Sequence, residues 1–309
     1  MLGSDAQLGA EDLTFVRSFL GTVRDKVRTL QPLIQEAHRA PQREAFTKKD
    51  GSFVTATDRA VERAFILALK LDFPNIPIIA EESESERILS FTGSAKDFYQ
   101  QLLSADYLIV LDPIDGTKNF VHGKREFCFA AALTRRTDAG LWPIAGVVAI
   151  PAEDRMFFNE GPILVEERIS DGAQKPLLRS EKNVEARVSA SSADRSWLES
   201  HSLKIQHPWV SSGSSVYDLL GTVSGRLRGS IVGSQRFWDI LAPLALANAV
   251  GLVLKDLATG ERVTSLSVKD LSDELDRRPW GFSRRFVLVP SERAVEEIVQ
   301  RTEGTVPSQ

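Results

Sequence analysis

Residues 107–111, Tyr-Leu-Ile-Val-Leu, form an unbroken apolar run near the middle of the chain. A strand with one face in water alternates apolar and polar residues, whereas an unbroken run is typical of a strand that is covered on both faces. Such a strand needs other elements packed above and below its sheet. The run therefore predicts a layered architecture of helices and sheets.

The rest of the chain supplies those layers. Apolar residues at helical spacing predict helices over 11–40, with a break or bend near Pro32, and over 59–71, after Asp58. Closely spaced strands between 127 and 158 predict antiparallel pairing, and the alternating second half completes an α/β (α+β) class. Further helices are predicted over 96–103, 193–200, 216–224, 238–250 and 292–301, and strands over 53–56, 76–80, 127–133, 144–150, 155–158, 187–190, 229–232, 251–255 and 286–289.

Charge and composition exclude several functions. A net charge of −4 argues against bulk nucleic-acid binding, which usually needs a basic face. The single cysteine, Cys128, excludes an intrachain disulfide and is expected to be buried in its apolar run. No window approaches the ~18 apolar residues of a membrane span, and the first residues lack a secretion signal. We therefore expect a cytoplasmic protein that binds neither nucleic acid nor membrane. The charged stretch 269–278 predicts a surface excursion.

Acidic residues follow the ends of two predicted strands. Asp112 and Asp115 come directly after the apolar run, on a turn imposed by Pro113, and Glu81 follows the strand over 76–80. Ligand sites in α/β sheets favour this edge. Two acids on one tight turn repel each other unless a cation lies between them, and Mg²⁺ prefers oxygen ligands. The pair therefore predicts a magnesium site.

Other acids admit a simpler interpretation when each is taken alone. Asp239 at the start of a helix is favoured by the helix dipole. Asp58 fits a helix N-cap, and Glu81-Glu82 fits a solvated pair in a loop.

Gly116-Thr117-Lys118 follows the two acids and suggests anion binding. Glycine lets the backbone approach a ligand closely, and free N–H groups at the start of a helix favour phosphate. Carboxylates for a metal beside amides for phosphate fit metal-assisted phosphoryl transfer to water. The chain lacks the Walker A spacing of glycines and lysine, so a nucleoside-triphosphate motor is not indicated.

Longer motifs give a resemblance. The segment Asp112-Pro113-Ile114-Asp115-Gly116-Thr117-Lys118-Asn119-Phe120 closely resembles the signature of the inositol monophosphatase superfamily, whose members are magnesium-dependent, often lithium-sensitive phosphatases. Trp238-Asp239-Ile240-Leu241-Ala242-Pro243 resembles the second signature of that superfamily. Val54-Thr55-Ala56-Thr57-Asp58 and Ala80-Glu81-Glu82-Ser83 match in the right order. The similarity covers most of the chain.

The resemblance implies a role for each matching residue. Glu81, Asp112, the carbonyl of Ile114 and Thr117 would surround one Mg²⁺ and the attacking water. Asp112, Asp115 and Asp239 would hold a second ion, and Glu81 would share a third. Asp58, bonded to the Thr117 hydroxyl, would help to deprotonate the water, and the Gly116 and Thr117 amides would bind phosphate.

The resemblance also implies a layered α-β-α-β-α sandwich, commonly a homodimer. Residues 1–155 would form a half that carries most metal ligands. Residues 156–309 would form a half that carries Asp239 and a substrate rim at Gly213-Ser214-Ser215.

The substrate is expected to be a small phosphomonoester, but the branch stays open. Inositol-specific members carry an acid seven positions before the last metal-binding aspartate, where this chain has Val232. Lys118 replaces their usual threonine, and lysine is commoner in 3′(2′),5′-bisphosphate nucleotidases and histidinol-phosphate phosphatases. Arg236 is a candidate contact for an anionic substrate. The alternative of another class is a non-catalytic regulatory member of the fold. Loss of acids would favour that alternative, and none is missing among Asp58, Glu81, Asp112, Asp115 and Asp239.

Overall fold

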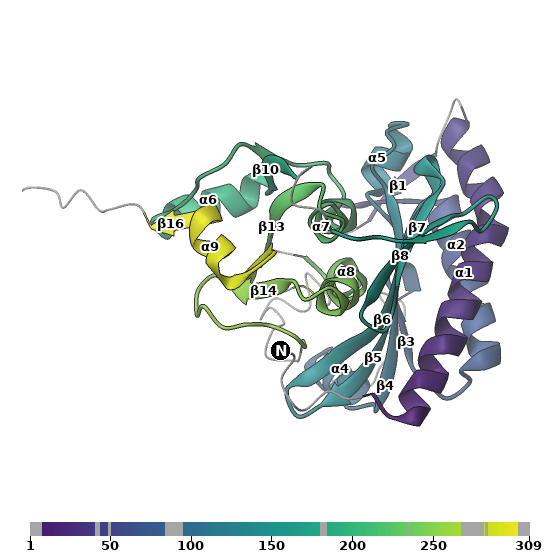
Figure 1. Cartoon of the computed structure of the whole chain (residues 1–309). Helices are drawn as coiled ribbons and strands as arrows, with labels where there is room; N and C mark the ends of the chain where they lie inside the picture. Colours follow the sequence, from purple (N-terminus) through teal and green to yellow (C-terminus); the bar gives the residue numbers. More distant parts are fainter. Residues whose placement is uncertain are drawn as a thin grey trace, which may run out of the picture.

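The computed structural model describes residues 8–40, 44–48, 51–83, 95–179, 184–233, 235–266, 281 and 284–301. These residues stack in five layers (Figure 1). The layers are, in order, helices α1 (Ala10–Arg39) and α2 (Ala56–Asp72), a seven-stranded sheet, helices α7 (Ser215–Val223) and α8 (Phe237–Ala249), a five-stranded sheet, and helices α6 (Ser192–Ser200) and α9 (Glu292–Ile298). The predicted α-β-α-β-α sandwich is confirmed.

The seven-stranded sheet contains the apolar run as its second strand. Its strands follow one another in chain order, with one parallel pair, β3 with β4, and antiparallel pairs from β4 to β9. Leu108 and Val110 face one hydrophobic core, and Ile109 and Leu111 face the other, so β4 is covered on both faces. The strands are β3 (Ile78–Ala80), β4 (Tyr107–Asp115), β5 (Cys128–Thr137), β6 (Gly140–Ile150), β7 (Arg155–Glu160), β8 (Ile163–Arg168) and β9 (Gln174–Pro176).

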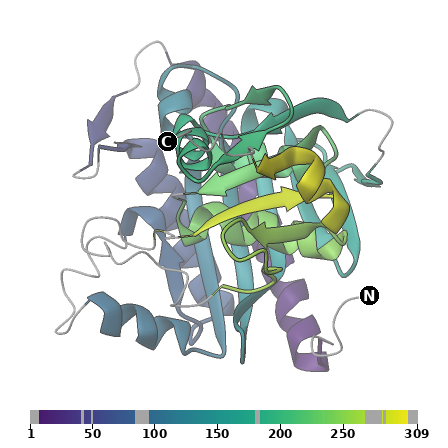
Figure 2. The same ribbon diagram turned by 90° about the vertical axis from the view of Figure 1, so that its left-hand side faces the viewer.

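The five-stranded sheet lies in front of the first sheet in Figure 2. Its order is β12-β10-β13-β15-β14, with β10 parallel to β12 and β13 and with β15 antiparallel to β13 and β14. The strands are β10 (Glu185–Ser189), β12 (Trp209–Val210), β13 (Leu227–Gly233), β14 (Val253–Asp256) and β15 (Arg285–Val289). Two-stranded ribbons join β1 (Ala45–Thr47) to β2 (Phe53–Thr55) and β11 (Leu203–Ile205) to β16 (Val299–Arg301).

Three hydrophobic clusters fill the spaces between layers. One joins α1 and α2 to the first sheet, one joins that sheet to α7, α8 and the second sheet, and one lies under α6 and α9. Helix α8 packs closely on β6 at Gly146, where a Cβ atom would lie 2.5 Å from the carbonyl oxygen of Ala242. Cys128 is buried with 0% exposure, as predicted.

Several elements differ from the prediction. Helix α1 runs on through Pro32 as one helix. The predicted helix over 292–301 ends at Ile298, because Val299–Arg301 pairs with β11. The seven-stranded sheet continues beyond residue 155 to β9. The division of the chain into halves 1–155 and 156–309 stays a prediction. The stretch 269–278 lies outside the described residues.

A short helix α4 (Ala95–Leu103), the single turn α5 (Thr117–Val121) and the 3₁₀ turn η1 (Pro151–Glu153) complete the elements. No helix in the described ranges is both long and apolar enough to cross a membrane.

Candidate active site

Three buried aspartates meet where β4 ends. The pairing of β4 with β5 is irregular between Asp112 and Asp115, and this bulge turns both side chains into one space. Asp239, in the first turn of α8, completes the group, and one carboxylate oxygen from each residue lies within 4.8 Å of the others. Acids placed far apart in the sequence therefore converge at the sheet edge that the sequence predicts.

Each aspartate is held in a different way. Asp115 Oδ2 accepts hydrogen bonds from the Ser214 hydroxyl and from the Val216 N–H at 2.9 Å, at the start of α7. Asp239 Oδ2 accepts from the Arg236 N–H at 2.8 Å in a capping box. Asp112 is 1% exposed, and no hydrogen-bond partner for its Oδ1 exists among the described residues. One buried oxygen is therefore left for a ligand.

The site is electrostatically strained without a cation. Burial, followed by the charge of Glu81, raises the pKa of Asp112 well above its usual range. Burial and the charge of Asp239 raise the pKa of Asp115 to about 8. Like charges in a desolvated space oppose ionisation of one another, and a bound divalent cation reverses that effect.

Asp58 and Thr117 form a hydrogen-bonded pair beside the aspartates. Thr55, not Asp58, is the N-cap of α2, and Asp58 stands at the third helical position of a capping box. The Thr55 N–H donates to Asp58 Oδ2 at 2.9 Å, which leaves Oδ1 to accept from the Thr117 hydroxyl at 3.1 Å. Thr117 Oγ1 also lies 3.1 Å from the carbonyl oxygen of Ile114. Burial raises the pKa of Asp58.

Glu81 follows β3, whose last residue pairs with Leu111 of β4. Within the described residues it is not a member of the three-aspartate group, and its Oε1 lies 2.8 Å from Lys48 Nζ. Lys48 also lies 2.7 Å from Glu82 Oε1. Sequence reasoning missed this contact, because a single lysine carries no pattern that marks its partner. The available signal was the adjacent pair Glu81-Glu82, because two neighbouring acids attract a cation.

Glu62 fixes the segment after β3. This buried residue of α2 accepts from the Glu82 N–H at 2.7 Å and from the Ser83 hydroxyl at 2.6 Å. Burial raises the pKa of Glu62, and burial with the Glu81 charge raises that of Glu82 to about 8. Sequence reasoning also missed this support, because a single glutamate on a helix carries no distinguishing pattern.

The Gly116 turn fits closely against the start of α7. Gly116 has φ of +86°, and a Cβ atom there would lie 2.9 Å from Ser214 Cβ. Asn119 donates to the carbonyl of Glu126 at 2.7 Å and to that of Ser212 at 2.9 Å, so α5 is tied to the predicted substrate rim. Lys118 is exposed.

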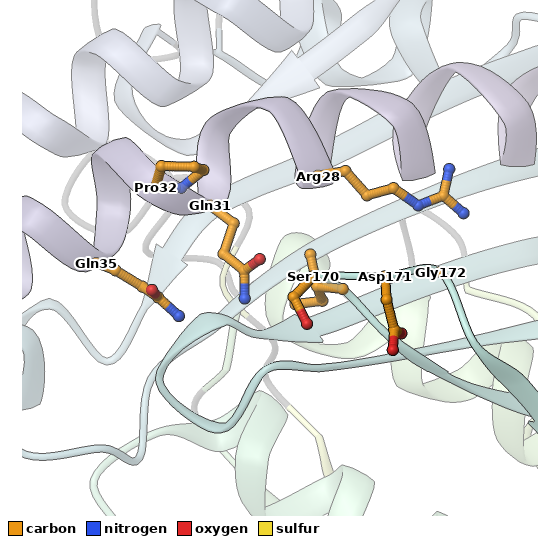
Figure 3. Close-up of a pocket in the computed structure, with 8 residues that line it drawn as sticks. Arg28, Gln31, Pro32, Gln35, Ser170, Asp171 and Gly172 are labelled. Carbon is orange, nitrogen blue, oxygen red and sulfur yellow. The ribbon is translucent and has the colours of Figure 1, made fainter.

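A cavity of 180 Å³ adjoins this rim and is lined in part by Gly213, Ser214, Ser215 and Val232. Arg236 is not among the described residues that line it, and its guanidinium lies 5.7 Å from the ring of Trp238. A larger cavity of 710 Å³ lies between α1 and the turn after β8 (Figure 3). It shares no described residue with the aspartate group.

Comparisons with known proteins agree with this arrangement. A model of the inositol monophosphatase family matches residues 18–280. Inositol monophosphatase 1 of Solanum lycopersicum is 27% identical over 256 residues, 80% of this chain and 87% of that protein. A probable inositol 1-monophosphatase of Mycobacterium tuberculosis is 32% identical over 235 residues, 72% and 77% of the two chains. A solved IMPase/NADP phosphatase complexed with Mg²⁺ and phosphate has a TM-score of 0.59 at 15% identity, over 91% of this chain and 92% of that one.

The layered fold and the buried carboxylates define a class, the metal-dependent phosphatases that act on small phosphorylated molecules. Within that class, the chain belongs to the inositol monophosphatase family, because the family model spans most of its length. The predicted resemblance, fold and enzyme class are therefore confirmed. The role of each site residue stays a prediction.

Proposed function

We propose that this protein hydrolyses a small phosphomonoester with a water molecule activated at the aspartate group, using two to three Mg²⁺ ions. The observation that carries the proposal is Asp112 Oδ1, a buried oxygen without a hydrogen-bond partner among the described residues, beside two further aspartates. A buried carboxylate is costly unless it is paired or binds a metal. Oxygen-only ligands fit magnesium.

The proposed ligands are Asp112, Asp115, Asp239, Glu81 and the carbonyl of Ile114. Three of them already lie within 4.8 Å of one another. Glu81 would have to exchange its contact with Lys48 for a cation. Bound magnesium would lower the pKa of a water molecule and screen the charge of the phosphate.

Thr117 and Asp58 are proposed to move the proton of the attacking water. The hydroxyl of Thr117 lies between Asp58 Oδ1 and the Ile114 carbonyl, so it accepts a proton from water while it donates its own to Asp58. Burial raises the pKa of Asp58, which makes it a stronger proton acceptor than an exposed aspartate. Glu81 would orient the water from the other side.

The phosphate is proposed to bind at the Gly116 and Thr117 amides, with Lys118 at the exposed edge. Gly116 has a positive φ and no Cβ atom of its own to cover that backbone, and Ser214 packs directly against it. The alcohol part of the substrate would lie against Gly213, Ser214 and Ser215, and Arg236 stays a candidate contact. A homodimer, which the family resemblance implies, and the cytoplasmic location expected from the sequence are further proposals.

Phosphate release tests the proposal. The panel is inositol 1-phosphate, histidinol phosphate, adenosine 3′,5′-bisphosphate and fructose 1,6-bisphosphate, each with and without Mg²⁺. We expect magnesium-dependent release from at least one ester. Failure of all four, in a protein shown to bind Mg²⁺, would contradict the proposal.

Two threonine variants test the proton path. Thr117→Ala should lower kcat by about 100-fold or more, the usual contribution of a positioned proton-transfer group. Thr134→Ala is the matched control, because Thr134 is also buried and donates its hydroxyl to the Leu108 carbonyl at 3.0 Å, away from the aspartates. Equal activity in the two variants would remove Thr117 from the mechanism.

A further inference from the structure

Three exposed bases lie on α5 and on the loop that follows it, and we call them the basic loop. They are Lys118, Lys124 and Arg125. Among the residues that the structure describes, none of the three forms an ion pair with a carboxylate. Exposed bases elsewhere are paired, as Arg136 is with Asp106 at 2.8 Å. The basic loop therefore carries positive charge that the fold leaves uncompensated.

The basic loop returns to the Gly116 turn, where the phosphate is proposed to bind. A Cβ atom at Gly116 would lie 3.1 Å from the carbonyl oxygen of Glu126, which directly follows the loop. Asn119 donates its side-chain amide to that carbonyl at 2.7 Å, and its own carbonyl accepts from the Lys124 N–H at 3.0 Å. At the other end of the loop, Lys118 is separated from Gly116 by one residue. The three charges therefore lie around that turn.

Two further contacts fix the loop without neutralising it. His38 packs its ring 4.9 Å from that of Phe127, and its Nε2 lies 2.8 Å from the carbonyl oxygen of Lys124. This contact involves the backbone of Lys124 and not its side chain. Arg125 donates to the carbonyl of Ala152 at 2.9 Å. A carbonyl accepts a hydrogen bond but carries no net charge, so the positive charge of Arg125 stays uncompensated.

A phosphate ester has an electrostatic reason to need such a loop. The protein carries a net charge of −4, and the site gathers Asp112, Asp115 and Asp239 in one buried group, with Glu81 and Glu82 after the adjacent strand. An anion that approaches from solvent is therefore repelled until it is close to bound cations. Fixed positive charge beside the entrance of such a site raises the local concentration of anions and their rate of association.

We propose that the basic loop guides phosphate esters from solvent to the Gly116 turn. This inference rests on the proposed phosphatase function. Lys124 and Arg125 act at a distance, through Coulomb attraction, so they assist the capture of substrate and leave the chemical step unchanged. Attraction between exposed charges weakens as salt shortens the screening length. The contribution of the loop should therefore disappear at high ionic strength.

A double variant at two ionic strengths tests the guidance. Lys118 is left in place, because it is also proposed to border the phosphate. At saturating Mg²⁺ and an ionic strength of about 0.02 M, Lys124→Gln/Arg125→Gln should lower kcat/KM about three- to tenfold for the best ester of the panel above. Its kcat should stay within about twofold of wild type. At about 0.5 M the loss should fall below about twofold, because the screening length drops from roughly 20 Å to roughly 4 Å.

Arg17→Gln/Arg136→Gln is the matched control, since it removes the same charge at the other end of the first sheet. Arg136 contacts Asp106, directly before β4 begins, and Arg17 lies in the part of α1 where Asp12 accepts from the Tyr107 hydroxyl at 2.7 Å. Figure 1 shows α4, which precedes β4, and α5 at opposite ends of that sheet. The control should match wild type. An equal loss in both double variants, or a loss that persists at 0.5 M, overturns the proposal.

Binding of inorganic phosphate separates this proposal from the phosphatase function. Calorimetric titration in Mg²⁺ at low ionic strength should give a Kd about threefold or more higher in the loop variant than in wild type and the control. That result without hydrolysis of any ester supports the guidance and contradicts only the phosphatase function. The same Kd in all three proteins overturns the guidance whatever the activity. Absence of phosphate binding in wild type overturns both.

Discussion

A buried carboxylate is tolerated where donors or cations surround it, and Glu167 and Asp112 differ in this respect. Glu167 is 0% exposed, and Arg24 and Arg28 each approach it to 2.6 Å. Asp112 is 1% exposed, and burial, followed by the charges of Glu81, Asp115 and Asp239, raises its pKa. Glu167 therefore stabilises the metal-free fold, whereas Asp112 destabilises it and suits a metal.

We predict opposite effects of amide substitution at these two residues. Metal-free Asp112→Asn should unfold at a temperature equal to wild type or about 2–4 °C higher, the shift that ~1 kcal/mol produces in a domain of this size. It should lose the rise in Tm that Mg²⁺ gives wild type, and more than about 100-fold of its activity. Differential scanning calorimetry in chelator and in Mg²⁺ measures both temperatures.

Glu167→Gln is the control for buried acids in general. It should lose about 2–3 kcal/mol of unfolding free energy, because the fully buried side chain loses its charged hydrogen bonds with Arg24 and Arg28. Its response to Mg²⁺ should stay that of wild type. A metal-free Asp112→Asn protein as unstable as Glu167→Gln would show that Asp112 supports the fold rather than the metal.

Among the elements, α5 connects the metal site to the substrate rim. Asn119 in this helix is 4% exposed, and its side-chain amide donates to two carbonyls, one of them Ser212. The same amide lies against Gly213, where a Cβ atom would come within 3.2 Å of it. Asn119 therefore acts as a positioning residue for the Ser212–Ser214 turn.

We predict that Asn119→Ala raises KM for the phosphate ester by about tenfold, the equivalent of one or two lost hydrogen bonds. Asn119→Asp, which keeps the size but cannot donate, should behave alike. Asn159 is the matched control, a buried asparagine that bonds the Gly146 N–H and the Ile144 carbonyl away from the site. Asn159→Ala should lower Tm without changing KM. An unchanged KM in both Asn119 variants would leave that residue a purely structural role.

Local pattern predicts an element well where packing and propensity agree. The run at 107–111 identifies β4, and helical spacing identifies α2, because each is set by the face it buries. The segment Val299–Arg301 was wrongly predicted as helix, since it becomes a strand only through pairing with distant Leu203–Ile205. The extension of β4 to Asp115 likewise depends on its partner β5.

The acids of the site were predicted from motifs, while their supports were not. Thr55 as N-cap is a local contact, three residues from Asp58, and was missed because Asp58 was interpreted as the cap. Lys48 against Glu81, and Glu62 behind the segment after β3, are contacts between separate elements. Such contacts depend on tertiary distance, which a single sequence does not display. Sequence reasoning therefore identifies charged groups at the site more readily than the residues that orient them.

At the scale of the molecule, the site is a junction of distant segments. Asp112 and Asp115 come from the first sheet, and the helices between the two sheets hold or supply the rest. Helix α7 holds Asp115 through Ser214 and Val216, and α8 contributes Asp239. The third and second layers therefore cannot separate without opening the metal site. Metal binding should accordingly stabilise the whole fold and not one loop.

The pH dependence of stability should reveal this linkage. In the metal-free protein the pKa values of Asp115 and Glu82 are raised to about 8, and that of Asp112 also lies well above its usual range. The folded state therefore holds protons that the unfolded state releases near pH 4. This contribution is fully present below the unfolded pKa and is lost as pH rises through the folded pKa. Stability of the metal-free protein should fall between about pH 5 and pH 8.

Saturating Mg²⁺ should weaken or reverse that fall, because the ion binds the ionised carboxylates and so binds more tightly as pH rises. Thermal unfolding at pH 5, 6, 7 and 8, in chelator and in Mg²⁺, measures the two slopes. The lowered pKa values of Glu166 and Asp256 affect stability only at lower pH, so they do not mask the trend. A metal-free Tm that rises steadily from pH 5 to pH 8 would show that the acids repel one another too weakly to drive metal binding.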